Sequence, residues 1–143
     1  MTTAIINTDM NIGPFKIPGN GQNMILNNYA ERNKIIVEEI IPEPFMSNAL
    51  ATTQWVHKKK KLKKVILCSI HQLPQKQKRI EDLINTMDDV EFHFALESIC
   101  GKGSKFLLDC IKEAKMFMNA KTIDSTKTTW LELFKLKQEI GTR

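Results

Sequence analysis

The chain has 143 residues, of which 42% are hydrophobic and 26% charged, and we expect residues 1–143 to form one globular domain with a net charge of +5. No apolar stretch is long enough to span a bilayer and no signal peptide is visible, so we expect a cytoplasmic protein without membrane insertion. The three cysteines are widely spaced and indicate neither a disulfide framework nor a zinc site.

The N-terminal part of the sequence predicts a strand, a long loop and a helix. Residues 3–7 form an apolar strand, and residues 8–21 contain three turn signals made of Gly, Pro and Asn. A loop of this length in a compact domain is more often functional than structural. Apolar positions at helical spacing then predict a helix over residues 22–33.

A second strand and a second helix follow in the sequence. Residues 34–40 are rich in Ile and Val, and we expect this strand to end before Pro42, because proline cannot continue a central ladder. Ser47 or Asn48 can cap a helix that reaches Lys60.

Lysine dominates the chain from Lys58 to Lys64. A basic run can bind nucleic acid or an anionic membrane surface. Nucleic-acid sites usually add arginines and stacking aromatics, and Trp55 is the one aromatic nearby. We therefore interpret the run as a solvated helix end, a reading that disfavours nucleic acid as a partner.

Residues 63–98 are the centre of the predicted fold and form a strand–helix–strand unit. The apolar run 65–68 predicts a buried parallel strand, Pro74 can open a helix over residues 75–88, and residues 92–96 predict the next strand. One apolar stripe on the helix consists of Ile80, Leu83, Ile84 and Met87. Strands that alternate with helices in this way predict a parallel sheet.

Two helices, over residues 104–119 and 128–140, complete the predicted elements, with a polar loop between them. Their broad apolar stripes predict that they cover the sheet or mediate dimerisation, so a homodimer is possible. The fold class is therefore α/β with three layers. We expect a mostly parallel four-stranded sheet in order 2-1-3-4 with helices on both faces, as in resolvase-like or flavodoxin-like folds.

The predicted site lies at the carboxyl ends of the parallel strands, where open α/β sheets bind ligands. His71 is a candidate general base, with a hydrogen bond to the loop backbone as the alternative. Glu97 is the second catalytic candidate; it can transfer protons, bind sugar hydroxyls or pair with the following helix. The segment 101–105 can hold a phosphate or form a turn capped by Ser104. The candidate binding residues are Asn7, Asp9, Gln22, Asn23, Ser69, Gln72, Arg79, Ser98 and Lys102.

The sequence predicts no metal site and no cofactor. The three histidines lie on separate elements without paired spacing. His93 alternates within a buried strand and is interpreted as a structural residue, whereas His57, beside the lysines, is interpreted as solvated. Cys68 and Cys110 lie on apolar faces and are typical of small core residues.

Residues 68–74, Arg79 and residues 91–98 resemble the core signature of the sporadic carbohydrate cluster family. The N-terminal pattern of that family is matched by Pro14-Phe15, Pro18, Gln22-Asn23 and Tyr29. The family tends to place Ser-Arg where Ile12-Gly13 stand in this chain. The resemblance implies a small protein of bacterial surface-polysaccharide gene clusters, and it carries over no catalytic residue.

The layout is also similar to the catalytic domain of serine recombinases. That resemblance implies a serine nucleophile after the first strand and several arginines around the scissile phosphate. Here residues 7–9 are Asn-Thr-Asp, and residues 71–74 are His-Gln-Leu-Pro where Asp-Arg-Leu would stand. We therefore expect the fold without the recombinase chemistry.

The resemblance to the sporadic carbohydrate cluster family implies a cytoplasmic protein of bacterial surface-glycan biosynthesis that binds a phosphorylated or nucleotide-linked sugar. Whether it also catalyses a reaction stays open. A non-enzymatic interaction or assembly module of the pathway is the alternative, and a nucleic-acid-binding protein derived from a recombinase-like fold is a third possibility. Convergence of the candidate residues in one pocket would favour a ligand site over the module.

Overall fold

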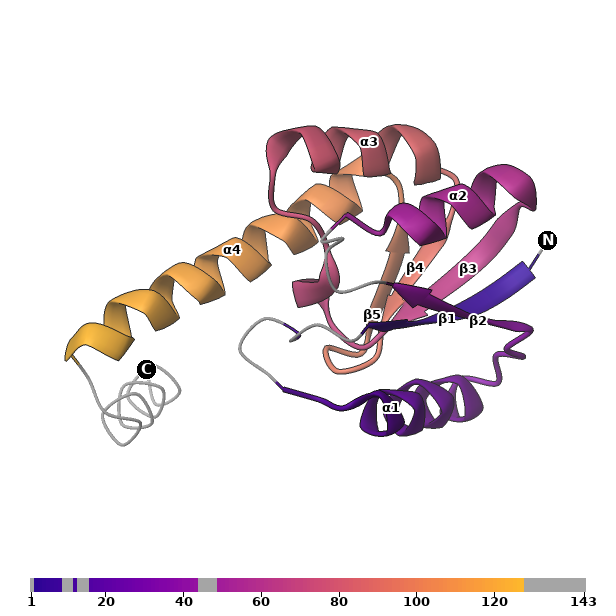
Figure 1. The fold of residues 1–143 in the computed structure, drawn as a ribbon, viewed down its shortest axis with the longest axis horizontal. Helices are drawn as coiled ribbons and strands as arrows, with labels where there is room; N and C mark the ends of the chain where they lie inside the picture. The colour runs from indigo at the N-terminus through magenta and orange to yellow at the C-terminus, as the bar shows by residue number, and fades with distance from the viewer. Residues whose placement is uncertain (1, 9–11, 13–15, 44–48, 128–143) are drawn as a thin grey trace.

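The computed structural model describes residues 2–8, 12, 16–43 and 49–127. They form a five-stranded sheet in the order β2-β1-β3-β4-β5, with helices on both faces (Figure 1). The elements are β1 (Thr2–Thr8), α1 (Gly19–Arg32), β2 (Glu39–Glu43), α2 (Ala51–Lys59), β3 (Leu62–Leu67), the 3-10 turn η1 (Ile70–Gln72), α3 (Gln77–Met87), β4 (Glu91–Phe94), β5 (Ile99–Lys102) and α4 (Ser104–Lys127). In this part of the chain no helix combines the length and the apolarity needed to cross a membrane.

The sheet is mixed and has one strand more than the sequence predicted. Strands β1 to β4 are parallel and follow the predicted order, but β5 pairs antiparallel with β4. The reversal is made by a turn over residues 95–98, in which Ser98 adopts a φ of 55°. The prediction of four strands was wrong because Gly101 and Lys102 were interpreted as loop, whereas they belong to β5.

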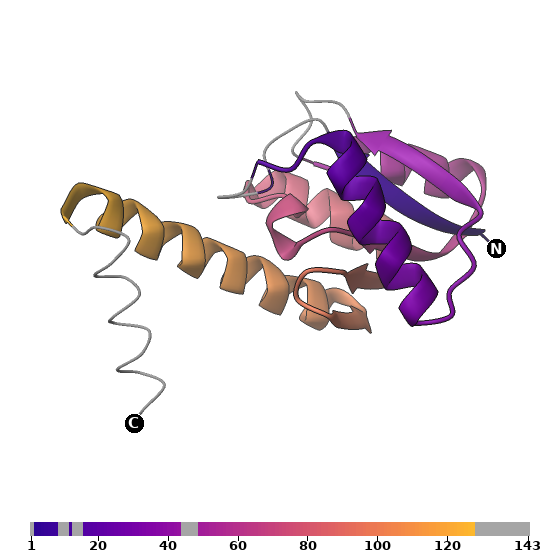
Figure 2. The same ribbon diagram turned by 90° about the horizontal axis from the view of Figure 1, so that it is seen from below.

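The core has two layers, one on each face of the sheet. Ile5 and Ile66 pack with Leu26, Tyr29 and Ala30 of α1. The neighbouring strand residues point to the other face and pack with the buried side chains of α3 and the first half of α4 and with the partly buried Val56 of α2. Figures 1 and 2 show α1 on one side of the sheet and the other helices on the opposite side. The predicted three-layer arrangement is therefore confirmed.

Strand β2 begins later than predicted and contains the proline that was expected to end it. Lys34, with a φ of 55°, follows α1, and the backbone N–H of Ile35 donates to Ala30 O at 2.8 Å. Because of this turn after α1, the strand predicted over residues 34–40 spans Glu39–Glu43 instead. Pro42 is tolerated because β2 is an edge strand that pairs only with β1. A proline in such a strand lacks an N–H without interrupting hydrogen bonds to two neighbouring strands.

Helices α1 and α2 also differ from the predicted bounds at their first residues. Helix α1 begins at Gly19 rather than residue 22, and α2 begins at Ala51; Ser47 and Asn48 lie outside the described residues. Glu43 takes the capping role at α2, because its Oε1 accepts from the N–H and the hydroxyl of Thr53, at 2.6 and 2.7 Å. A carboxylate at the positive end of a helix is favourable.

Helix α4 is one continuous helix of 24 residues where a helix and a polar loop were predicted. At 1.5 Å per residue it is about 36 Å long. Its first half covers the sheet through buried Leu107, Cys110, Ile111 and Ala114, as expected. Its second half extends away from the sheet (Figures 1 and 2). The helix predicted over 128–140 lies outside the described residues, and dimerisation stays a prediction.

Candidate functional site

The carboxyl ends of β1, β3 and β4 are neighbours in the sheet, as the predicted site requires. Strand β3 is followed at this edge by η1, and β4 by the turn that leads to β5. We call the polar side chains at these strand ends, on η1 and in the first turns of α1 the carboxyl-edge cluster: Asn7, Gln22, Asn23, Ser69, His71, Gln72 and Glu97. Asp9, also predicted here, lies outside the described residues.

Glu97 connects the β4–β5 turn to η1. Its Oε2 accepts the hydroxyl of Ser69 at 2.7 Å, and its Oε1 accepts the N–H of Ile70 at 3.0 Å. The Ser69 hydroxyl in turn accepts the N–H of His71 at 3.2 Å. Both carboxylate oxygens therefore hold the 3-10 turn, and Glu97 does not pair with the helix that follows it.

Gln72 closes the same turn from its other end. Its Oε1 accepts the backbone N–H groups of Cys68 and Ser69, at 2.7 and 3.2 Å. Because both partners are donors, the orientation of the amide is fixed with oxygen toward the backbone. The amide nitrogen, Nε2, is buried and finds no acceptor among the residues that the structure describes. A buried amide donor without an acceptor costs about 1–3 kcal/mol.

Gln22, Asn7 and Asn23 attach α1 to the end of β1. Gln22 is fully buried; its Oε1 accepts the N–H of Thr8 at 2.9 Å, and its Nε2 donates to the carbonyls of Thr8 and Ile17. Asn7 Nδ2 donates to Asn23 Oδ1 at 2.7 Å. These predicted binding residues are brought together, and their hydrogen bonds stabilise the strand–helix connection.

His71 is half-buried, and its ring meets Phe117 of α4 edge-on, with centroids 5.4 Å apart. Burial lowers the pKa of His71, and the carboxylates of Glu97 and Glu113 offset this only in part. The imidazole is therefore neutral at pH 7. A neutral imidazole can accept a proton, which is what a general base requires.

Arg79 is half-buried in the first turn of α3 and makes no ion pair with any described residue. Lys76 precedes this helix as its N-cap residue, Lys78 lies beside Arg79, and no acidic residue lies in the first turn. Cations are unfavourable at the positive end of a helix dipole. This helix end therefore favours an anion.

Two predicted binding residues do not belong to the cluster. Ser98 lies in the β4–β5 turn, and its hydroxyl donates to Ala95 O at 3.4 Å. Lys102 pairs in register with Glu91, the first residue of β4, because β5 runs antiparallel. It therefore lies near the amino end of β4, away from the carboxyl-edge cluster, and its role in binding stays a prediction.

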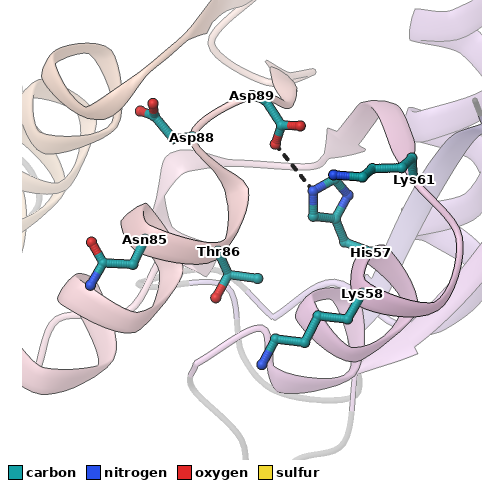
Figure 3. Close-up of a pocket in the computed structure, with 7 residues that line it drawn as sticks. All are labelled: His57, Lys58, Lys61, Asn85, Thr86, Asp88 and Asp89. Carbon is teal, nitrogen blue, oxygen red and sulfur yellow. Dashed lines mark hydrogen bonds and ion pairs between the residues drawn. The ribbon is translucent and has the colours of Figure 1, made fainter.

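A hollow of about 610 Å³ opens at the amino edge, between the ends of α2 and α3 (Figure 3). Its lining residues are His57, Lys58, Lys61, Asn85, Thr86, Asp88 and Asp89. The two lysines are opposed by two aspartates, so this surface favours neither anions nor cations. The lysine run itself is exposed at Lys58–Lys61, at the end of α2, as the sequence predicted.

His57 is buried in this region, and the prediction of a solvated side chain was wrong. The N–H of Leu62 donates to its Nδ1 at 3.0 Å, so the ring proton is on Nε2, which donates to Asp89 Oδ1 at 3.1 Å. Burial raises the pKa of Asp89, but the hydrogen bond from its own backbone and the electrostatic attraction of His57 and Lys61, together with the His57 hydrogen bond, lower it more. The start of β3 encloses His57, which the spacing of lysines could not reveal.

The remaining histidine and the two core cysteines lie where the sequence placed them. His93 is buried, and its Nδ1 lies 2.8 Å from Tyr29 Oη. Cys68 and Cys110 are buried, and burial raises the pKa of their thiols to about 12 and about 11. These thiols are protonated at neutral pH and do not act as nucleophiles. Glu91 and Cys100, which the sequence analysis did not select, adjoin His93.

No protein-family model matches the chain, and no curated protein matches it in sequence. One similar solved structure is the crystal structure of the N-terminal catalytic domain of TP901-1 integrase. It is 16% identical, with a TM-score of 0.56, and the match covers 85% of this chain and 99% of that one. The recombinase-like layout predicted from the sequence is confirmed as a fold. Nothing in these comparisons supports the resemblance to the sporadic carbohydrate cluster family.

Proposed function

We propose that the carboxyl edge of the sheet binds a small phosphate-bearing ligand, with a sugar phosphate or a nucleotide sugar as the class to test first. The observation that carries the proposal is the buried amide nitrogen of Gln72, whose two hydrogens find no acceptor among the described residues. A ligand oxygen placed there would accept from this group. The ligand would then recover the free energy that the unsatisfied donor costs.

The first turn of α3 supports the same ligand class. Backbone N–H groups and the dipole at a helix N-terminus bind phosphate, and Arg79 adds a guanidinium that matches phosphate geometry. The helix follows η1, which carries Gln72, after four residues. An anion would also relieve the unfavourable placement of Lys76 and Lys78 at this helix end.

Binding without turnover is sufficient to explain the cluster. Ser69, Gln22 and Glu97 are engaged in the bonds that hold η1 and α1. His71 is the one catalytic candidate whose neutral ring suits proton transfer. The choice of a sugar as the phosphate-bearing group follows from the resemblance of residues 68–98 to a glycan-cluster family, and a role in surface-glycan biosynthesis is part of this proposal.

The test is calorimetric titration of the full chain with inorganic phosphate, sugar phosphates and nucleotide sugars. Gln72→Glu keeps the carbonyl-type oxygen that Cys68 and Ser69 need but removes the donor, and Arg79→Gln removes the cation. We expect each change to weaken binding about tenfold or more, because each removes a charge-assisted or buried hydrogen bond. Arg32→Gln, an exposed change on α1, is the matched control.

Two results would overturn the proposal. Binding that survives both Gln72→Glu and Arg79→Gln would place the ligand elsewhere. The absence of binding by every ligand in the series would favour an interaction module. In that case the exposed apolar residues of α4, Leu108, Met116 and Phe117, would be the first surface to examine.

Nucleic acid is a second candidate, favoured by one surface. Trp55 is 60% exposed, and Lys59 Nζ lies 5.6 Å from the centre of its ring, within the exposed lysine run. An exposed aromatic beside lysines is the combination that single strands use for stacking and charge neutralisation. Titration with DNA across a salt series tests it, since phosphate contacts give a steep salt dependence that Trp55→Ala and Lys59→Gln would reduce.

A further inference from the structure

The antiparallel pairing of β4 with β5 gathers three potential metal ligands. Glu91 and His93 are two residues apart on β4, so their side chains lie on the same face of the sheet. Cys100 is the register partner of His93 on β5. The ligand atoms of the three side chains all lie within 4.8 Å of one another. Residues from two strands therefore converge on one point, away from the carboxyl-edge cluster.

His93 is oriented as a metal-bound histidine is. Tyr29 of α1 lies 2.8 Å from Nδ1, and its ring meets the imidazole edge-on. This leaves Nε2 facing Glu91, whose Oε2 is 3.1 Å away. Ligating histidines almost always bond a neighbouring oxygen through the second ring nitrogen, which fixes the ring. The buried side of the site is thus built from Tyr29 and His93.

We propose that Glu91, His93 and Cys100 bind a divalent transition metal of the Zn²⁺ class. Imidazole nitrogen, thiolate sulfur and carboxylate oxygen are the three donor types that Zn²⁺ takes in proteins. His93 is buried, Glu91 is half-buried and Cys100 is exposed, so the metal can enter from solvent. Three protein ligands leave one tetrahedral position for water or for a side chain of another molecule.

Metal binding exchanges protons with solvent. Without metal, Nε2–H of His93 donates to the Glu91 carboxylate, and Nδ1 lies 2.8 Å from Tyr29 Oη. A metal ion on Nε2 takes the place of that proton, and Nδ1–H then donates to Tyr29 Oη. The Cys100 thiol releases its proton to solvent as it becomes a thiolate ligand.

Lys64 competes with the metal for the carboxylate. Its Nζ lies 3.6 Å from Glu91 Oε2, and the ammonium is a positive charge beside the proposed cation. Replacing it with a neutral side chain should therefore tighten metal binding. The direction of this effect is opposite to the one expected if Lys64 merely stabilised the fold.

The experiment is titration of the reduced full chain with Zn²⁺ by calorimetry and with Co²⁺ by absorption spectroscopy. The wild type should bind one ion and give a thiolate-to-cobalt charge-transfer band with the intense visible bands of a tetrahedral site. Cys100→Ser should abolish the charge-transfer band, and Glu91→Gln should weaken binding. Tyr29→Phe should keep the spectrum but lower affinity about tenfold or more, as a positioning residue does.

Controls separate the site from general effects on the fold. Glu38→Gln, an exposed change before β2, should bind as the wild type does, and Lys64→Gln should bind more tightly. Circular dichroism of each variant verifies that it is folded. A wild type that binds neither ion overturns the proposal, as does a Co²⁺ spectrum that is unchanged in both Cys100→Ser and Glu91→Gln.

Discussion

Removal of the Glu97 carboxylate tests whether this residue holds the 3-10 turn or acts on a ligand. Glu97→Ala removes the acceptor for the Ser69 hydroxyl, at 2.7 Å, and for the Ile70 N–H, at 3.0 Å. A hydrogen bond to a charged group is worth about 1.5–3 kcal/mol when buried, and Glu97 is half-buried, so we take about 1–1.5 kcal/mol for each. The expected loss is about 2–3 kcal/mol, or roughly 6–12 °C in Tm.

Urea denaturation followed by circular dichroism measures this loss directly. Glu97→Gln keeps one acceptor and should lose about 1 kcal/mol. Ser69→Ala combined with Glu97→Ala should show a coupling of about 0.5–3 kcal/mol, because both changes break the same bond. Glu113→Ala, an exposed change on α4, should stay within about 0.5 kcal/mol of the wild type. A Glu97→Ala protein of unchanged stability that no longer binds ligand would refute the structural role.

Three further predictions follow from other contacts in the structure. Gln22→Ala removes the three side-chain hydrogen bonds to the backbone of Thr8 and Ile17 and should cost about 2–4 kcal/mol in urea denaturation; a cost below that of Gln54→Ala would contradict the assignment. His71 should titrate below its ordinary pKa of 6.5 in an NMR pH series, and Glu97→Ala should lower the value further because that carboxylate raises it; an upward shift would be inconsistent. Gly101→Ala brings a Cβ into close contact with the Phe106 ring and should cost about 1–3 kcal/mol, a loss that Phe106→Leu should reduce in the double variant.

The order of the parallel strands could be predicted because it follows from local patterns. The buried runs in β1 and β3 and the apolar stripe of α3 each specify an element, and the βαβ alternation then leaves few topologies. The strand β5 could not be predicted in the same way. Its four residues alternate between half-buried and exposed positions and contain a glycine, so they carry no apolar run.

The proximity of the candidate residues could be predicted, but their contacts could not. Parallel strands put polar residues at one edge whatever their roles, which is why Ser69, Gln72 and Glu97 could be expected to lie close together. The direction of each hydrogen bond depends on tertiary contacts, and a sequence does not distinguish a glutamine that anchors backbone, such as Gln22, from one that faces a ligand. Cys100 was missed because it becomes a neighbour of His93 only through the antiparallel pairing of β5 with β4, which the sequence did not predict.

The position of Pro42 in β2 bears on how the folded protein avoids aggregation. An unprotected edge strand can template pairing with a strand from another molecule. On β2 the N–H of one of five residues is missing, and Glu39 at the start of the strand pairs with Lys60, whose Nζ lies 2.6 Å from Oε1. A second chain would find an incomplete row of donors and a charged ion pair at the edge. We expect Pro42→Val to raise the rate of thioflavin-positive fibril growth while leaving the native spectrum unchanged, because the continuous edge would accept an incoming strand.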